Sequence, residues 1–139
     1  LITIFEKKIL METNTESKLS LTNVFKANAV MNFLSGAMML LMGEMMFEEV
    51  GMTATEDLVS MGIWTGATMM IIGIMTWKMP DWAGENLSDV GKFMAAFMCA
   101  WLAIAIYEVV SGKFTVAQNA IPLVGNALFA GLLYWKSQD

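Results

Sequence analysis

The chain has 139 residues, enough for one domain, and its 13 acidic residues and 8 lysines give a net charge of −5. Hydrophobic residues make up 57% of it, charged residues only 15%, and the mean hydropathy is +0.58. A soluble domain of this size would leave too much apolar surface in water, so the composition excludes an ordinary soluble fold and favours a membrane protein.

Polar residues gather at the N-terminus. Residues 1–20 mix charged and polar side chains and lack the long apolar core of a conventional signal peptide. We therefore expect residues 1–26 to form a polar tail, either solvated or containing a short surface helix.

Four apolar runs follow, each close to the ~20 residues with which a helix crosses a ~30 Å hydrocarbon layer. They cover residues 27–46, 58–77, 93–110 and 116–135. None alternates with a period of two, and a sheet of four strands could not close into a barrel, so strands are disfavoured. The sequence predicts an all-α, integral membrane, antiparallel four-helix bundle over residues 27–135, followed by a short C-terminal tail at 136–139.

Capping residues locate several helix ends. Thr55 and Ser88 are each followed directly by acidic residues, which is typical of an N-cap with acids in the first turn. Pro122 leaves two possibilities for the last helix. If Asn119 caps it, Pro122 falls in the first turn and breaks no hydrogen bond, whereas an earlier start would kink the helix at Pro122.

Lysines and aromatic residues indicate how the helices lie across a membrane. Seven of the eight lysines fall on one side of the predicted topology, and only Lys113 falls on the other. By the positive-inside rule, both termini are expected on the cytoplasmic or equivalent side. Aromatic residues that prefer the membrane interface occur at the same helix ends, namely Trp77, Trp82, Tyr134 and Trp135.

The residue types of most catalytic and metal sites are scarce. The chain has no histidine, no arginine and a single cysteine, Cys99, which lies inside an apolar run. Phosphate-binding and dinucleotide-binding glycine motifs are absent as well. Because nucleophile–base pairs, zinc sites and haem-ligating histidines need these residues, we expect no enzymatic activity, cofactor, metal site or nucleic-acid partner.

Carboxylates are concentrated on the side that carries few lysines. Glu44 and Glu108 lie near the ends of the first and third spans at a similar expected depth, so they could face each other. Six acids against one lysine give this side the whole net charge of −5, because the remaining seven acids and seven lysines cancel. Such a face could attract cations or a basic partner, although carboxylates that reach water or cap helix ends are the simpler interpretation. The further acids expected there are Glu48, Glu49, Glu56 and Asp57.

Methionine is abundant, with 15 residues. Met38, Met42 and Met45 share one helical face of the first span. Thioethers select Cu(I), so a copper path can be imagined, but no histidine or cysteine pair accompanies them. Adaptable packing in irregular apolar gaps is the favoured interpretation.

Small and amide residues indicate helix contacts. Gly62 and Gly66 are spaced i, i+4 and would let the backbone of a neighbouring helix approach closely. Asn28 and Asn32 share a face of the first span, and Asn126 lies in the fourth. Since amides inside a membrane need partners, we favour interhelical hydrogen bonds over a polar ligand pocket.

Several short motifs occur in an order that resembles a known family. They are Asn32-Phe-Leu-Ser-Gly36, Gly62-Ile-Trp-Thr-Gly66, Tyr107-Glu-Val-Val-Ser-Gly112 and Asn126-Ala-Leu-Phe-Ala-Gly131. Over residues 24–135 the chain resembles the small four-span bacterial membrane proteins of the DoxX-like kind. The resemblance implies an antiparallel four-helix bundle and carries over no functional residue.

Two functions fit these features. The first is an accessory or interaction protein in a larger membrane assembly, with the lipid bilayer, other membrane subunits or a second copy as partners. The alternative is a binding or transport module for a small lipophile or a cation, with Glu44, Glu108, Asn32 and Asn126 around a cavity. We favour the first, because four short helices enclose little volume and the paired broken helices of many transporters are missing.

Overall fold

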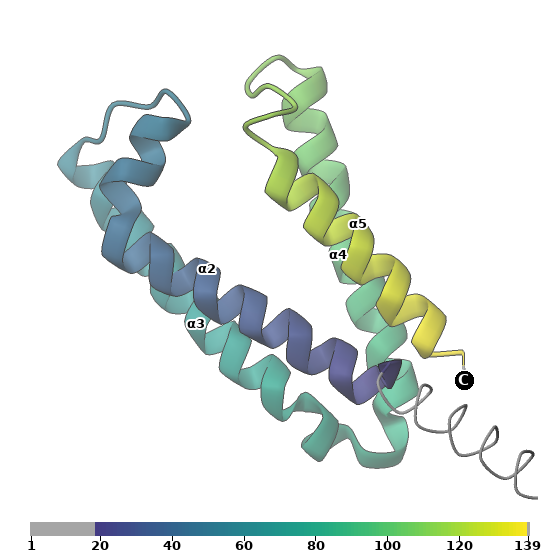
Figure 1. Ribbon diagram of the computed structural model, residues 1–139. Helices are drawn as coiled ribbons and strands as arrows, with labels where there is room; N and C mark the ends of the chain where they lie inside the picture. Colours follow the sequence, from purple (N-terminus) through teal and green to yellow (C-terminus); the bar gives the residue numbers. More distant parts are fainter. Residues whose placement is uncertain (1–18, 139) are drawn as a thin grey trace, which may run out of the picture.

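The computed structural model describes residues 19–138 and contains helices but no strand over that range (Figure 1). The all-α prediction is therefore confirmed. A 3₁₀ segment, η2 (Gly84–Asn86), joins the second and third α-helices without an intervening loop. The four α-helices are α2 (Leu21–Glu49), α3 (Glu56–Ala83), α4 (Leu87–Val110) and α5 (Ala120–Lys136).

The first helix begins earlier than predicted. Ser20 is its N-cap, and the Ser20 hydroxyl accepts a hydrogen bond of 3.3 Å from the backbone N–H of Asn23. Residues 21–26 are thus helical and do not belong to a polar tail, because a serine cap starts the helix before the apolar run does. Of the rest of the predicted tail, residues 1–18 lie outside the described residues.

The two predicted N-caps have different outcomes. The Thr55 hydroxyl accepts from the N–H of Leu58 at 3.3 Å, so Thr55 caps α3 as predicted. The prediction for Ser88 is wrong, because η2 leads directly into α4 and leaves Ser88 inside the helix. Its hydroxyl instead donates to the carbonyl oxygen of Ser137 at 2.6 Å and so ties the start of α4 to the end of α5.

The last helix follows the first of the two alternatives for Pro122. Asn119 occupies the N-cap position, α5 starts at Ala120, and Pro122 is the third helical residue, where no backbone hydrogen bond is lost. The predicted span 116–135 therefore loses its first turn. With 17 residues α5 is the shortest of these helices, and at 1.5 Å per residue it is about 26 Å long.

The helices pair as two antiparallel hairpins (Figure 1). Helix α2 packs along α3, and α4 packs along α5, whereas contacts between the two hairpins are few. The hairpins meet where α2 and α4 begin and α3 and α5 end, and they diverge from there (Figure 1). We call this the lysine end, since Lys26, Lys78, Lys92 and Lys136 lie in these parts of the helices.

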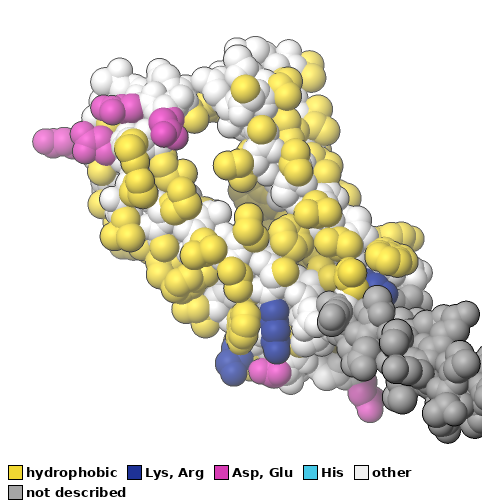
Figure 2. Space-filling view, in the orientation of Figure 1, with side chains coloured by type: hydrophobic (Ala, Val, Ile, Leu, Met, Phe, Trp, Pro, Cys, Tyr) yellow, Lys and Arg dark blue, Asp and Glu magenta, His cyan; other side chains and the backbone are white. Residues whose placement is uncertain are grey.

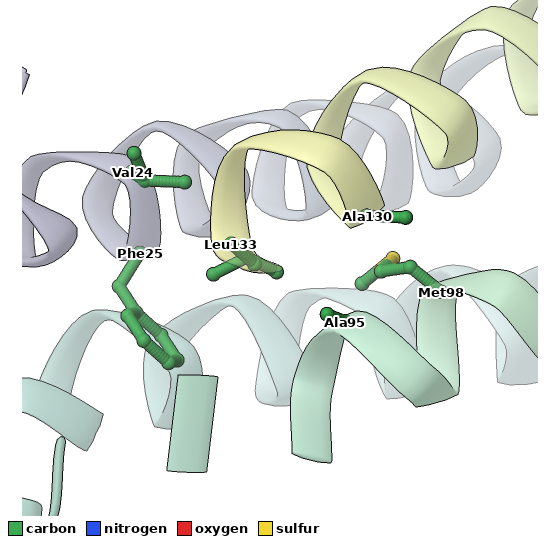
Figure 3. Close-up of a cluster of buried hydrophobic side chains, with 6 residues drawn as sticks. All are labelled: Val24, Phe25, Ala95, Met98, Ala130 and Leu133. Carbon is green, nitrogen blue, oxygen red and sulfur yellow. The ribbon is translucent and has the colours of Figure 1, made fainter. Parts of the chain in front are cut away.

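A small apolar core holds the hairpins together at the lysine end. Phe25 and Leu133 are its most deeply buried members, with exposures of 0% and 1%. The two side chains come from α2 and α5, and residues of α4 complete the cluster (Figure 3). Its buried members are Val24, Phe25, Ala95, Met98, Ala130 and Leu133.

The contact between α2 and α3 depends on glycine. A Cβ built on Gly66 would lie 2.7 Å from the carbonyl oxygen of Gly36, and one built on Gly36 would lie 2.5 Å from that of Gly66. At Gly73 a Cβ would lie 2.9 Å from the oxygen of Ala29, and at Gly62 it would lie 3.0 Å from the ring of Phe47. The structure thus places both predicted contact glycines, Gly62 and Gly66, on the face of α3 that lies against α2.

Helix α2 is broken near its end. Met42 has φ −133° and ψ 20°, which is not helical, and it directly precedes Gly43, a residue type that weakens helices. The break lies within the predicted methionine face, and Met38, Met42 and Met45 are 50%, 42% and 45% exposed. That the three share one helical face stays a prediction.

The glycine contact predicts opposite effects for two matched substitutions. In Gly66→Ala the new methyl group meets backbone atoms that cannot move aside, so the free energy of unfolding should fall by roughly 1–2 kcal/mol. In Gly131→Ala the methyl group meets no atom within 4 Å, and the free energy should rise by up to ~1 kcal/mol from helix propensity. Unfolding followed by circular dichroism measures both, and a stabilised Gly66→Ala variant would contradict the contact.

Candidate functional site

Antiparallel packing separates the charges along the molecule. Acidic side chains lie at the far end of the α2/α3 hairpin, and the lysines in view lie toward the opposite end, with a few acids beside them (Figure 2). We call the end formed by residues 44–57 and 105–119 the acidic end. It contains the candidate acidic residues and both hairpin loops.

The acids of α2 lie on its surface. Glu44 is exposed and follows the break at Met42, and it lines a wide-open hollow of about 400 Å³ together with Glu48. Glu49 is exposed as well. Within residues 19–138 no three side chains of the metal-binding acidic or cysteine type come together. These carboxylates are therefore exposed surface charges, and they do not line an enclosed site.

Glu108 has a different environment. It is half-buried on α4, and its Oε2 accepts a hydrogen bond of 3.4 Å from Nδ2 of Asn119. The same Nδ2 donates to the carbonyl oxygen of Ala105 at 3.2 Å, and Asn119 itself is only 8% exposed. The partner of Glu108 thus comes from its own hairpin, whereas Glu44 lies on the other hairpin. The structure gives no pairing of Glu44 with Glu108.

A residue that the sequence analysis missed connects the two hairpins at the acidic end. Nε2 of Gln118 donates to the carbonyl oxygen of Val50 at 2.8 Å. Oε1 of Gln118 accepts from the N–H of Thr115 at 2.8 Å, and the Thr115 hydroxyl accepts from the N–H of Gln118 at 3.3 Å. This reciprocal pair has the hydrogen-bond pattern of a capping box, here in the turn before α5, and the spacing Thr-x-x-Gln is the sequence signal that could have revealed it.

The hairpins are therefore joined at both ends and open between them. The space-filling view shows this opening, with hydrophobic side chains on both of its sides (Figure 2). We call it the central opening. It lies between the cluster of Phe25 and Leu133 at the lysine end and the bond from Gln118 to Val50 at the acidic end.

The asparagines that were predicted to form interhelical hydrogen bonds lie in α2 and α5. Asn28 is buried, and its Oδ1 accepts from Nδ2 of Asn32 at 2.8 Å. Nδ2 of Asn32 also donates to the carbonyl oxygen of Asn28 at 3.0 Å. These bonds run within α2 and replace the predicted interhelical bonds, because side chains four residues apart already lie within reach. Asn126 is half-buried in α5.

These features define an all-helical protein of two antiparallel hairpins that are linked at their ends. Comparison with known proteins gives no match to a protein-family model, a curated protein or a solved structure. The DoxX-like resemblance accordingly stays a prediction.

The link through Gln118 can be tested by measuring the distance between the two loops. One hydrogen bond contributes a net ~0.5–1.5 kcal/mol, so Gln118→Ala should increase the population of separated loops roughly twofold to tenfold. Spin labels at the exposed positions Thr53 and Lys113, in a Cys99→Ser background, report this as a longer and broader distance distribution.

The matched control is Ser111→Ala, which removes a loop hydroxyl that bonds only within its own hairpin, to the oxygen of Glu108. Its distance distribution should equal that of the parent. An equal distribution for Gln118→Ala would show that the bond to Val50 does not hold the loops together.

Proposed function

We propose that this protein is a membrane-embedded scaffold that holds a transmembrane helix of a partner protein between its two hairpins. The observation that carries the proposal is the central opening, where two hairpins that are joined at both ends leave hydrophobic side chains unpacked (Figure 2). A fifth helix in this space would complete a bundle that the chain alone leaves open.

Membrane embedding is supported by where the apolar residues lie. Helix α2 and the helical stretch Glu56–Val110 are long and apolar enough to cross a membrane, judged by length and composition. In the most apolar 18 residues of each, only 11% and 22% of the residues are buried. The core helix of a soluble protein is mostly buried, and water does not tolerate so many exposed apolar side chains. Leu41, Val110 and Ile121 are among them, each more than three-quarters exposed.

The lysine end supports a particular orientation. The Lys26 ammonium lies 5.3 Å from the ring centre of Trp77, and the Lys136 ammonium lies 4.5 Å from that of Trp135. Tryptophan and lysine are typical residues of a membrane–water interface. By the positive-inside rule we place this end, and both termini, on the cytoplasmic or equivalent side.

One side of α2 fits a helical partner. Val24 belongs to the cluster at the hairpin junction, Asn28 is buried one turn farther along, and helical spacing places Asn32 and Ser35 on the same side beyond it. Small and amide side chains favour helix association in lipid, because they permit close approach and hydrogen bonds across the interface. A partner helix would therefore contact this side of α2.

The alternative, a transport module for a cation or small lipophile, has less support from the geometry. Glu44 lies in an exposed hollow, and Glu108 is already bonded to Asn119. Neither carboxylate lines an enclosed path. The accessory function is therefore the better supported of the two.

Photo-crosslinking in native membranes tests the scaffold. A photoreactive residue in place of Ser35 should form a crosslink to one partner protein, identified by mass spectrometry. The matched control replaces Trp64, which is 75% exposed on α3, and helical spacing puts it opposite the contact glycine Gly66. Equal crosslinking from both positions, or none from Ser35, would rule out a partner in the opening. A product of twice the chain mass would identify the partner as a second copy.

A further inference from the structure

We infer that the α2/α3 hairpin binds one phospholipid with an anionic headgroup, with its phosphate beside Lys26 and Lys78 and part of an acyl chain in a groove between the helices. The inference rests on the membrane embedding proposed above. It concerns another side of α2 than the one that faces the central opening, since Val30 and Leu34 lie across the helix axis from Asn28 and Ser35 by helical spacing.

The groove has the size and chemistry of a site for a slender apolar chain. Its volume is about 240 Å³, which is below the ~300–1,000 Å³ of sites that enclose compact ligands. Its lining includes Gly73 and Ala29, where the backbones of α3 and α2 approach each other closely. The residues that line it are Ala29, Val30, Phe33, Leu34, Gly73, Ile74, Trp77 and Lys78, of which Lys78 alone is charged.

Two cations lie at one end of this groove. Lys78 belongs to its lining, and the Lys26 ammonium lies over the ring of Trp77, which also lines it. A lysine pair at the end of an apolar groove is complementary to a phosphate that continues into an acyl chain. Figure 2 shows lysine side chains together at the lower edge of the hydrophobic surface.

The ion pair that the described residues form with these lysines leaves them able to bind a phosphate. Lys78 Nζ lies 3.6 Å from Oδ2 of Asp81, and both side chains are more than half exposed. Such an exposed pair is weak, and an ammonium group has three donors, so Lys78 can bind a phosphate oxygen as well.

A lipid fits this groove better than a protein helix does. From Ala29 to Leu34 the groove extends along α2 for only about 8 Å, at 1.5 Å per residue. A partner helix would need apolar contacts over several turns, and it would bring no phosphate to the lysines. An acyl chain needs only a narrow channel below its headgroup.

The test is native mass spectrometry of the full chain in detergent, titrated with phosphatidylglycerol or phosphatidylcholine of identical acyl chains. Wild type should bind phosphatidylglycerol more tightly. Lys26→Gln with Lys78→Gln should weaken this binding about fivefold for each lysine and leave phosphatidylcholine unchanged.

The chain offers a closely matched control in Lys92→Gln with Lys136→Gln. Lys92 pairs with Asp89 at 3.3 Å, as Lys78 pairs with Asp81, and Lys136 lies over Trp135, as Lys26 lies over Trp77. This variant removes the same charge at the same end of the molecule but away from the groove. It should keep the phosphatidylglycerol affinity of wild type.

A third variant tests the groove without changing the charge. Val30 lines the groove and is 44% exposed, so Val30→Trp should fill the space and weaken binding of both lipids. Equal losses in the two lysine variants, or unaltered binding in Val30→Trp, would overturn the lipid site. Alkaline carbonate extraction of wild type from membranes separates the two proposals. Release would overturn membrane embedding and the lipid site together, whereas retention with equal losses in the lysine variants would overturn the lipid site alone.

Discussion

The approach of two backbones at Gly36 and Gly66 determines how the rest of the molecule is arranged. Neither position has room for even one methyl group, so α2 and α3 form a unit that cannot separate without losing its tightest contact. At the glycines of the other hairpin the surroundings differ: a Cβ on Gly125 or Gly131 of α5 would meet no atom within 4 Å, and one on Gly91 of α4 would meet the side-chain oxygen of Ser137 and not a backbone. The chain therefore consists of two hairpins of different construction, which are joined by η2 and the cluster around Phe25 at one end and by a loop hydrogen bond at the other.

Helix α2 accordingly has three sides with different roles. One carries Gly36 and packs against α3, a second carries Asn28 and leads from the hairpin junction toward the central opening, and a third carries Val30 and lines the groove. Polar side chains on the second side satisfy one another through the bond from Asn32 to Asn28, so α2 keeps its hydrogen bonds whether or not a partner is present. The scaffold proposed above would need this independence when no partner is bound, because buried unpaired amides are unfavourable.

Local chemistry explains which parts of this arrangement could be predicted from the sequence. The apolar runs and the capping role of Thr55 depend on neighbouring residues only, and they predict the helices well. Ser88 has the same local pattern, but α4 already begins at Leu87, directly after η2. The Ser88 hydroxyl donates a hydrogen bond to Ser137, at the end of α5. The divergence of the hairpins depends on which helix faces contact each other across the molecule. These long-range contacts cannot be read from the residues of any one apolar segment. The candidate acids show the same limit, since Glu108 finds Asn119 through a loop whose path the sequence does not specify.

The short α5 has a consequence for the lipid around it. In a bilayer a helix of about 26 Å does not reach across a ~30 Å hydrocarbon layer, whereas its 24-residue neighbour α4, at about 36 Å, does. In the membrane embedding proposed above, the α4/α5 hairpin would create a hydrophobic mismatch on one side of the molecule, and the bilayer there would have to thin to match α5. This would make thinner bilayers energetically preferable. The position of one proline near the start of α5 would in this way influence which cellular membrane the protein enters.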